Sequence, residues 1–506
     1  MFILFILSGL VFSFTTLKIF FKLSNPAFDH YAHISIIKDI KANNRRFIKK
    51  TSNIIDEKNF ATPILFHWLL SQLSFDKVRN HYLRINSIIE QLVYCIAVLL
   101  VIQLYGDISA LEIGLAFLLI ATNPFNRFIW NAKSRGISPR NFGILLGYLY
   151  LMVFTSELFL QHTLMRILLL SVLSLLIILS SQFISQYIII FSIFILFFGD
   201  FHPVFSLFVS FLSFRVFFPE ISRRFFQGQW EHKRMWFKHL AKVDLWNRRH
   251  SIYRDFIYDF YIRKSLKYFL TNPFVEAILG FPLFFSLLVL APYELIGNTV
   301  VLSAIVAFLI TSFKYTRAFG EPQRYLEMAL PGLVFLGIKF LSIENLQILV
   351  IVNLIIFLFH IVVFVDFYNK PKFSDSRIKT VEDFILNNTI KKKPILLGNA
   401  WSSAGFLLPE KRIDIIIPTF TSWKQYGIPI NEILPNDLFI INPKVLSSWI
   451  LRYKPDWFLL EEQYWDQVSF EQTLAEINVT FKKTLIDNQI LLYQLDESPT
   501  HEVSLY

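Results

Sequence analysis

The chain lacks the features on which several classes of soluble protein depend. Only one of its 506 residues, Cys95, is a cysteine, and it lies inside an apolar run, so no internal disulfide can form. No group of cysteines and histidines has the spacing of a zinc site. The G-x-G-x-x-G and P-loop motifs of nucleotide-binding proteins are also missing. The sequence therefore gives no support to a disulfide-rich, zinc-binding or nucleotide-binding protein.

Charge is missing from long stretches of the chain. Runs such as Tyr187–Phe198 and Leu346–Val365 hold no Asp, Glu, Lys or Arg, and several runs reach the roughly 18–20 residues that a helix needs to cross about 30 Å of hydrocarbon. In addition, 54% of the residues are hydrophobic and 56 are phenylalanine, as expected if side chains face lipid as well as a protein core. We therefore predict a polytopic α-helical membrane protein.

Hydropathy predicts about eleven spans. They cover residues 2–21, 86–105, 109–125, 141–158, 164–180, 183–199, 201–218, 274–291, 295–313, 328–342 and 346–366. The first of them has no basic segment before it and no small-residue cleavage site, so it is interpreted as a span and not as a cleaved signal.

The connections between these spans are of two kinds. Five segments are long or charged, namely 22–85, 126–140, 219–273, 314–327 and the tail from 367, and the others are short turns. An even number of predicted spans separates each of the five from the next. All five are therefore predicted to lie on one side of the membrane, where they form a single working face.

This working face is basic. The net charge is +11, and nearly all of it lies in the loops and tail, so we expect lipid head groups or lipid phosphates as partners and no nucleic acid. Residues 219–273 interleave bases with aromatic rings, as in R-R-F-F and K-R-M-W-F-K. This pattern is typical of helices in the head-group layer. The alternative, a solvated connector, explains the density of aromatic residues less well.

The tail has a different character. Short apolar segments read as strands at Pro394–Gly398, Ile413–Pro418, Leu438–Ile441, Trp457–Leu460 and Ile490–Leu495, with helical segments at Val445–Tyr453 and Phe470–Ile477. This order predicts a small C-terminal α/β domain. We therefore divide the chain into a transmembrane domain, residues 1–366, and a soluble domain, residues 367–506.

Three histidines and an aspartate stand out in the first long loop. Asp29 follows the first span and is close to His30 and His33. A carboxylate here could take a proton from an acceptor hydroxyl, or it could simply cap the helix predicted over residues 31–41. The two histidines and Asp29 make only a weak metal site. His67 lies inside the apolar segment 61–70, and its position favours a packed core histidine over a functional one.

A pair of arginines precedes the tenth predicted span. Arg317 and Arg324 lie in the stretch S-F-K-Y-T-R-A-F-G-E-P-Q-R-Y-L-E-M-A-L-P. A guanidinium suits bidentate binding of a phosphate, so the pair could hold a lipid phosphate. The alternative is that both side chains reach the head groups from the span end without forming a site.

Several of these segments together resemble the GT-C glycosyltransferases, a superfamily that includes protein O-mannosyltransferases and the aminoarabinose transferase of lipid A. The resemblance rests on the apolar first helix, the early Asp29, and the segments A-T-P-I-L-F-H-W-L-L, D-K-V-R-N-H-Y-L-R-I-N-S, R-A-F-G-E-P-Q-R-Y-L-E-M-A-L-P and L-R-Y-K-P-D-W-F-L-L-E. It implies transfer of a sugar from a polyprenyl-phosphate donor to a hydroxyl-type acceptor on a lipid, glycan or protein.

The same resemblance assigns roles. Asp29 takes the place of the first-loop carboxylate that activates the acceptor, and Arg324, with Arg317, is expected to hold the lipid phosphate. The other residues expected to contact the substrate or the lipid phosphate are Tyr325, His30, His33, His67, Lys133 and Arg135. Many relatives have a second acid next to the first, where this chain has His30. We therefore expect no cofactor, and a divalent metal is not favoured.

Sidedness is a conflict within the sequence. In the GT-C family the first loop and the tail lie outside the cytoplasm, which for a bacterial protein is the outer side of the inner membrane. The positive-inside rule places this basic face in the cytoplasm instead. We follow the resemblance. A transporter or flippase of lipid-linked sugars and a non-enzymatic membrane scaffold stay as alternatives. A transporter would be expected to have internal repeats and ionisable residues in the middle of its spans, and the sequence shows neither.

Overall fold

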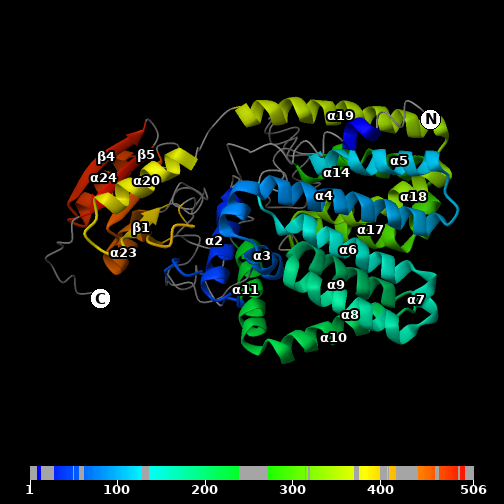
Figure 1. The fold of residues 1–506 in the computed structure, drawn as a ribbon, viewed down its shortest axis with the longest axis horizontal. Coiled ribbons are helices and arrows are strands. Elements are labelled where there is room, and N and C mark those ends of the chain that lie inside the picture. Colours follow the sequence, from blue (N-terminus) through cyan, green and yellow to red (C-terminus); the bar gives the residue numbers. More distant parts are fainter. Residues whose placement is uncertain are drawn as a thin grey trace. The chain divides into compact units, whose positions relative to one another are not determined.

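The computed structural model describes most of the chain, and the described residues fall into two compact units. These residues are 8–12, 28–48, 51–55, 62–127, 136–238, 272–313, 315–316, 319–369, 375–398, 407, 409–416, 443–461, 467–487 and 490–495. The helical unit takes in 1–23, 62–223 and 248–370, and the sheet unit takes in 24–61, 224–247 and 371–506 (Figure 1).

The helical unit consists of helices joined by short turns. They are α3 Leu65–Ser71, α4 Phe75–Tyr105, α5 Ala110–Ala121, η2 Pro124–Arg127, α6 Pro139–Thr155, α7 Glu157–Gln161, α8 Thr163–Ser180, α9 Gln182–Leu196, α10 His202–Phe217, α14 Pro273–Gly280, α15 Pro282–Leu290, α16 Pro292–Gly297, α17 Thr299–Thr311, η7 Pro322–Ala329, α18 Leu330–Phe340 and α19 Ile343–Asn369. α11, Pro219–Lys238, runs from this unit into the other.

Local sequence explains where these helices begin. Ser109 and Glu112 form a reciprocal capping box at the start of α5, and Asn272 and Asn298 cap α14 and α17 through their side chains. Proline occupies one of the first two positions of α6, α10, α14, α15, α16 and α18, where its missing N–H costs nothing.

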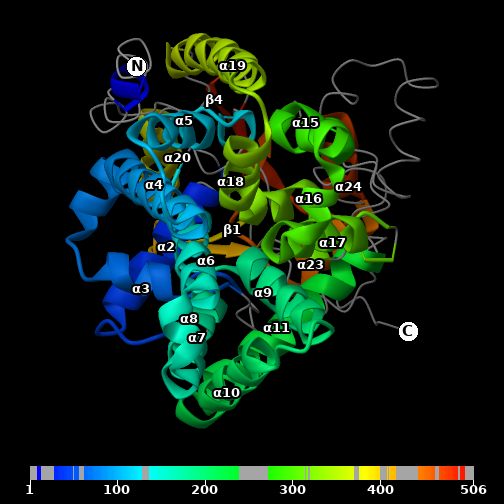
Figure 2. The same ribbon diagram turned by 90° about the vertical axis from the view of Figure 1, so that its right-hand side faces the viewer.

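The long helices pack side by side. α4 contacts α6, α6 contacts α8, and α8 contacts α10, while α9 contacts α17 (Figure 2). α6 also approaches η7 closely, because Gly147 leaves room for the side chain of Met328; a Cβ at Gly147 would lie 2.6 Å from the terminal carbon of Met328. This contact brings the 3₁₀ helix η7 against the bundle.

Each predicted span from residue 86 onward contains a helix, but the structure divides some of them. The span predicted at 274–291 is two helices, α14 and α15, bent by 79° at Phe281, because Pro282 interrupts the hydrogen-bond ladder. By length and composition, two of the described helices, α4 and α8, could cross a membrane, or four if each bent pair is counted as one span. The predicted number of eleven is not confirmed. Of the first predicted span only residues 8–12 are described.

The segment predicted to lie in the head-group layer begins with a sharp turn. α10 and α11 are bent by 119° at Phe218. α11 carries the predicted mixture of bases and rings, with Phe226 and Trp230 exposed. Residues 239–271 lie outside the described part of the chain.

The sheet unit contains five strands in the order β2-β1-β3-β5-β4. The strands are β1 Ile395–Gly398, β2 Asp414–Ile416, β3 Trp457–Glu461, β4 Phe481–Asp487 and β5 Ile490–Leu495, and the helices are α2 Phe28–Ala42, α20 Asp375–Asn387, α23 Pro443–Tyr453 and α24 Gln467–Glu476. β1 pairs in parallel with β2 and β3, and β5 pairs antiparallel with β3 and β4. The small C-terminal sheet that the sequence predicts is thus present. The strand predicted at Leu438–Ile441 lies outside the described residues.

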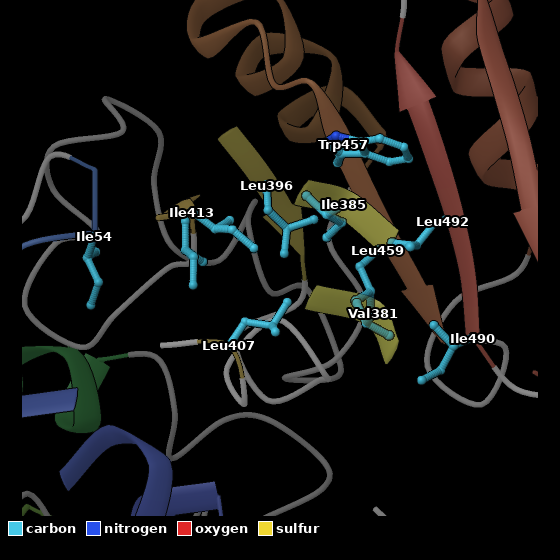
Figure 3. Packing of buried hydrophobic residues seen from close by; sticks show 11 residues of the cluster. Ile54, Val381, Ile385, Leu396, Leu407, Ile413, Trp457, Leu459, Ile490 and Leu492 are labelled. Carbon is cyan, nitrogen blue, oxygen red and sulfur yellow. The ribbon is translucent and has the colours of Figure 1, made fainter. Parts of the chain in front are cut away.

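Residues from the first long loop complete this sheet. Ile54 forms a parallel bridge with Ile415 of β2, where the Ile415 N–H donates to Asn53 O at 2.8 Å and the Ile55 N–H donates to Ile415 O at 3.1 Å. Ile54 also joins the buried core of the unit and is seen at one side of the cluster in Figure 3. The boundary proposed between residues 366 and 367 stays a prediction, and the packed unit includes a segment from near the N-terminus.

Candidate functional site

The helical unit gathers polar side chains around η7. Three of the eight residues of this short 3₁₀ helix, P-Q-R-Y-L-E-M-A, are strongly polar. Two of these three, Gln323 and Glu327, are nevertheless buried, and so is Tyr325. Buried polar groups need partners, so the neighbours of each one show what the segment can do.

Glu327 pairs with an arginine from another helix. Arg140, in the first turn of α6, donates to Glu327 Oε2 through Nη2 at 2.7 Å and Nε at 3.2 Å. Both side chains are almost buried, with 11% and 4% of their surface exposed. Tyr148, about two turns further along α6, donates its hydroxyl to the backbone oxygen of Glu327 at 2.7 Å. The pair therefore fixes η7 to α6 and places a guanidinium at this end of α6.

Arg324 is the more accessible arginine. Its side chain is 28% exposed, forms an ion pair with Glu321, and places its guanidinium carbon 4.6 Å from the centre of the Phe183 ring. The backbone permits this because Gly320 has a φ of +114° and because a Cβ there would collide with the same ring. Arg324 thus has a cation held against an aromatic face, with part of its surface open to a ligand.

Tyr325 points into the bundle. It is 1% exposed, and its hydroxyl donates to Gln186 Oε1 at 2.7 Å and lies 2.9 Å from the backbone oxygen of Phe319. These contacts tie η7 to α9. The predicted contact of Tyr325 with a lipid phosphate stays a prediction.

A second buried pair lies at the start of η7. Gln323, 1% exposed, donates through Nε2 to Glu276 Oε2 of α14 at 2.5 Å. The other amide atom of Gln323, Oε1, is buried and has no hydrogen-bond partner among the described residues. A buried acceptor without a partner is costly, and the contacts of the described residues do not account for this one.

Asp29 belongs to α2 in the sheet unit. α2 begins at Phe28, three residues before the predicted start, so Asp29 lies in the first turn of the helix instead of preceding it. A carboxylate in the first turn is favoured by the helix dipole. The side chain of Asp29 is outside the described part of the structure. His30, next to it, is 4% exposed and has its ring edge-on to Tyr31, and His33 is half-buried.

His67 is a packed residue. It is fully buried in α3, and its Nδ1 donates to the backbone oxygen of Pro63 at 3.0 Å. These contacts are those of a packed core histidine, and the predicted contact of His67 with the substrate stays a prediction. Arg317, Lys133 and Arg135 lie outside the described residues.

Sequence reasoning overlooked several members of the η7 cluster. Arg140 is the last residue of the predicted loop 126–140, and Glu327 lies in the stretch that contains Arg317 and Arg324. The sequence patterns predict no role for either residue. Their pairing spans 187 positions. The available signal was that both are charged residues at the edge of apolar segments. Glu276 offered the same signal, as an acid inside the span predicted over 274–291.

Sequence comparisons identify nothing similar, whereas structural comparison does. No protein-family model matches the chain, and no curated protein matches it. ArnT from Cupriavidus metallidurans in the apo state superposes with a TM-score of 0.53 at 11% identity, over 97% of each chain. The apo oligosaccharyltransferase from Archaeoglobus fulgidus superposes with a TM-score of 0.54 at 12% identity, over 98% of this chain and 74% of that one.

A second structure of the oligosaccharyltransferase, in complex with zinc and sulfate, gives a TM-score of 0.51 at 12% identity over 97% of this chain and 73% of that one. At such identities the likeness concerns the fold. Within the described residues, no three of His, Cys, Asp and Glu are grouped so that they could hold a metal ion. The expected independence of metal stays a prediction.

Proposed function

We propose that this chain, which has the GT-C fold that its motifs predict, is a membrane glycosyltransferase using a polyprenyl-phosphate sugar as donor. The observation that carries the proposal is the arginine cluster at η7. Arg324 is partly exposed, and the nearly buried Arg140 belongs to the same cluster through Glu327, which lies three residues after Arg324. A partly exposed guanidinium at the end of a bundle of apolar helices, held in place by a second arginine, suits an anionic phosphate carried on a lipid.

In the proposed reaction the acceptor oxygen forms a bond to the anomeric carbon of the sugar. The bond from that carbon to the phosphate oxygen breaks, and its electron pair goes to the polyprenyl phosphate. Arg324 stabilises the negative charge that develops on this leaving group. Asp29 takes the proton of the acceptor hydroxyl. General-base catalysis of this kind typically contributes about 10²–10⁴ in rate.

Charge balance at Arg324 indicates how the donor would bind. Glu321 already neutralises this arginine, so an incoming phosphate has to share or replace that ion pair. A partly exposed ion pair of this kind contributes little, on the order of 1 kcal/mol, and is replaced more readily than a buried one. Arg140, paired with a nearly buried carboxylate, is not replaced as easily. We therefore assign phosphate binding to Arg324 and support of η7 to Arg140.

The membrane itself is the other partner in the proposal. The basic segments on the predicted working face suit an anionic lipid surface. We propose that this face is extracytoplasmic and that the membrane is the bacterial inner membrane, in line with the resemblance.

The test is a transfer assay in lipid vesicles. Vesicles containing the purified protein receive polyprenyl-phosphate sugars labelled in the sugar, together with an extract of membrane lipids, glycans and proteins. We expect label in an acceptor, and we expect Asp29→Asn to lower kcat by about 10²–10⁴ while the protein still inserts. Asp76→Asn, at an exposed acid in the first turn of α4, is the matched control and should transfer normally.

Two outcomes contradict the proposal. If Asp29→Asn transfers sugar at the normal rate, Asp29 is not the base. If labelled lipid crosses the vesicle membrane but no acceptor gains label, the protein is a transporter of lipid-linked sugars. A cysteine-free variant with single cysteines placed in the loops, labelled from each side, tests the sidedness.

A further inference from the structure

α2, the helix that carries Asp29, is bound to the C-terminal part of the chain by a buried ion pair. Asp39 lies near the end of α2 and is 5% exposed. The ammonium of Lys411 lies 2.9 Å from Asp39 Oδ2, and it also donates to Ser35 Oγ at 2.6 Å and to Asn53 Oδ1 at 3.0 Å. A single lysine therefore connects two positions of α2 with the segment that follows it.

Further hydrogen bonds join the same two segments. Lys38 donates to the backbone oxygen of Pro409 at 2.9 Å, and the side-chain amide of Asn53 donates to the backbone oxygens of Glu410 and Ile413 at 3.0 and 3.2 Å. On the α2 side, the N–H of Ser52 donates to Asp39 at 3.0 Å. Residues 409–413 are thus bound to α2 and to residues 52–53 through both side chains and backbone.

Apolar packing adds to these contacts. Ala32, one turn from Asp29, packs against the core cluster of the sheet unit, and Ile54 is part of that cluster. A helix of fifteen residues is marginal in water on its own. Its position therefore depends on what it packs against, and within the sheet unit residues around β2 contact it.

We infer that the segment 409–416 positions α2 for catalysis and that Lys411 is the positioning residue. This rests on the proposed function, in which Asp29 is the base. Lys411 touches no reacting group in this scheme; it sets the position of the helix that carries the carboxylate. Geometry matters because a misplacement of about 1 Å can lower a rate by roughly 10²-fold. The C-terminal domain then belongs to the catalytic apparatus and is more than an attached module.

The test compares Lys411→Met with a matched ion pair of the same domain. Lys483 pairs with Glu471 at 3.1 Å in the sheet unit, outside residues 409–416, so Lys483→Met removes an ion pair and leaves the contacts of α2 intact. Two quantities are measured on the full-length protein in lipid: hydrogen exchange of the α2 amides, and kcat and KM for the donor lipid.

We expect Lys411→Met to speed exchange of residues 28–42 by about tenfold or more, because it leaves Asp39 buried without its cation. We expect kcat to fall by about 10–10²-fold with KM for the donor changed less than twofold. Lys411→Arg, which keeps the charge, should restore most of both quantities, and Lys483→Met should change neither.

A second variant guards against misfolding. Asp39→Asn with Lys411→Met removes both charges, so no unpaired charge stays buried, and the sheet unit should keep its fold. Its α2 should still exchange faster than in the wild type.

Unchanged protection of α2 in Lys411→Met, or a loosened α2 with an unchanged kcat, overturns the inference. Failure of the proposed function is recognised separately, because then the wild-type protein transfers no sugar from any donor tested. The exchange comparison needs no transfer, and unchanged protection would still decide against Lys411.

Discussion

A nearly buried arginine lies at each end of α6, and the contacts at the two ends differ. At its start, Arg140 binds Glu327 of η7. At its end, the backbone oxygen of Phe154 accepts from Nη2 of Arg166, which also binds Asp200 Oδ2 at 2.9 Å. A helix rises about 1.5 Å per residue, so the two arginines act about 20 Å apart along α6.

At the second end the charged groups bind one another. Asp200 accepts from both the backbone N–H and Nδ1 of His202, at 2.9 and 2.6 Å, in addition to Arg166. Burial alone would raise the pKa of Asp200, but the hydrogen bonds from His202 and the charge of Arg166 hold it below its ordinary value. These contacts join the start of α8 and the turn before α10 to the end of α6.

The comparison teaches that a buried arginine with a carboxylate is not by itself evidence of a ligand site. Both ends of α6 have one. Among the described residues, only the η7 end adds a second arginine, Arg324, whose side chain is 28% exposed. We therefore expect substitutions at Arg140 and Arg166 to affect stability and substitutions at Arg324 to affect the donor lipid.

The largest effect is expected at Glu327. Glu327→Leu leaves Arg140 nearly buried without its carboxylate and should lower the free energy of unfolding by about 3–5 kcal/mol, measured by thermal or denaturant unfolding in detergent. The double variant Arg140→Met with Glu327→Leu should recover most of this loss, because no buried charge then stays unpaired. If the double variant is as unstable as the single one, the pair does not stabilise η7 in the way described.

A smaller loss is expected at the second end. Arg166→Met should lower the free energy of unfolding by about 1–3 kcal/mol, since Asp200 keeps its hydrogen bonds from His202. Because this end has no exposed arginine among the described residues, KM for the donor lipid should not change. A large rise in KM would show that the ends of α6 do not differ in the manner proposed.

Arg324 should show the reverse pattern. Arg324→Met should raise KM for the polyprenyl-phosphate donor by about 10–10²-fold, the equivalent of losing one hydrogen bond to a charged group, with little change in stability. Glu321→Gln removes the competing carboxylate and should lower KM by a few-fold. Both values come from the transfer assay, and equal KM values in the two variants would argue against phosphate binding at Arg324.

The smallest effect is expected in the sheet unit, where Arg412 is 63% exposed between Glu382 and Glu410. Burial and the neighbouring Glu410 raise the pKa of Glu382 from 4.5 to about 7. Between pH 4.5 and 7 the folded state therefore binds more protons at this group than the unfolded state does. Its contribution to stability is complete below pH 4.5 and is lost as the pH rises through 7.

Glu382→Gln should flatten this dependence, which can be followed by thermal unfolding between pH 5 and 8. Glu476→Gln, at an exposed acid at the end of α24, is the matched control and should keep the wild-type slope. A wild-type slope in Glu382→Gln as well would assign the dependence to another group.

The sequence predicted what depends on local pattern. The span predicted at 201–218 is α10 at 202–217, and the strand predicted at Trp457–Leu460 is β3, because hydrophobic periodicity is read directly from neighbouring residues. β4 was not predicted, since its lysines, Lys482 and Lys483, interrupt the apolar run of an edge strand. The pairs at the site were also not predicted. Arg140 and Glu327 are brought together by packing over 187 positions, which no local pattern encodes.

The bridge between Ile54 and Ile415 has a consequence for the order in which the protein is made. Asn53 and Ile413, which are hydrogen-bonded there, are 360 positions apart. The ribosome therefore synthesises residues 51–55, which pair with β2 at the edge of the sheet, long before it synthesises the five strands. Residues 51–55 have to wait, without their partner strand, until every helix of the bundle has been synthesised. The loop that emerges among the first parts of the chain is among the last to reach its final structure, and a chain truncated before β2 would leave α2 without its support.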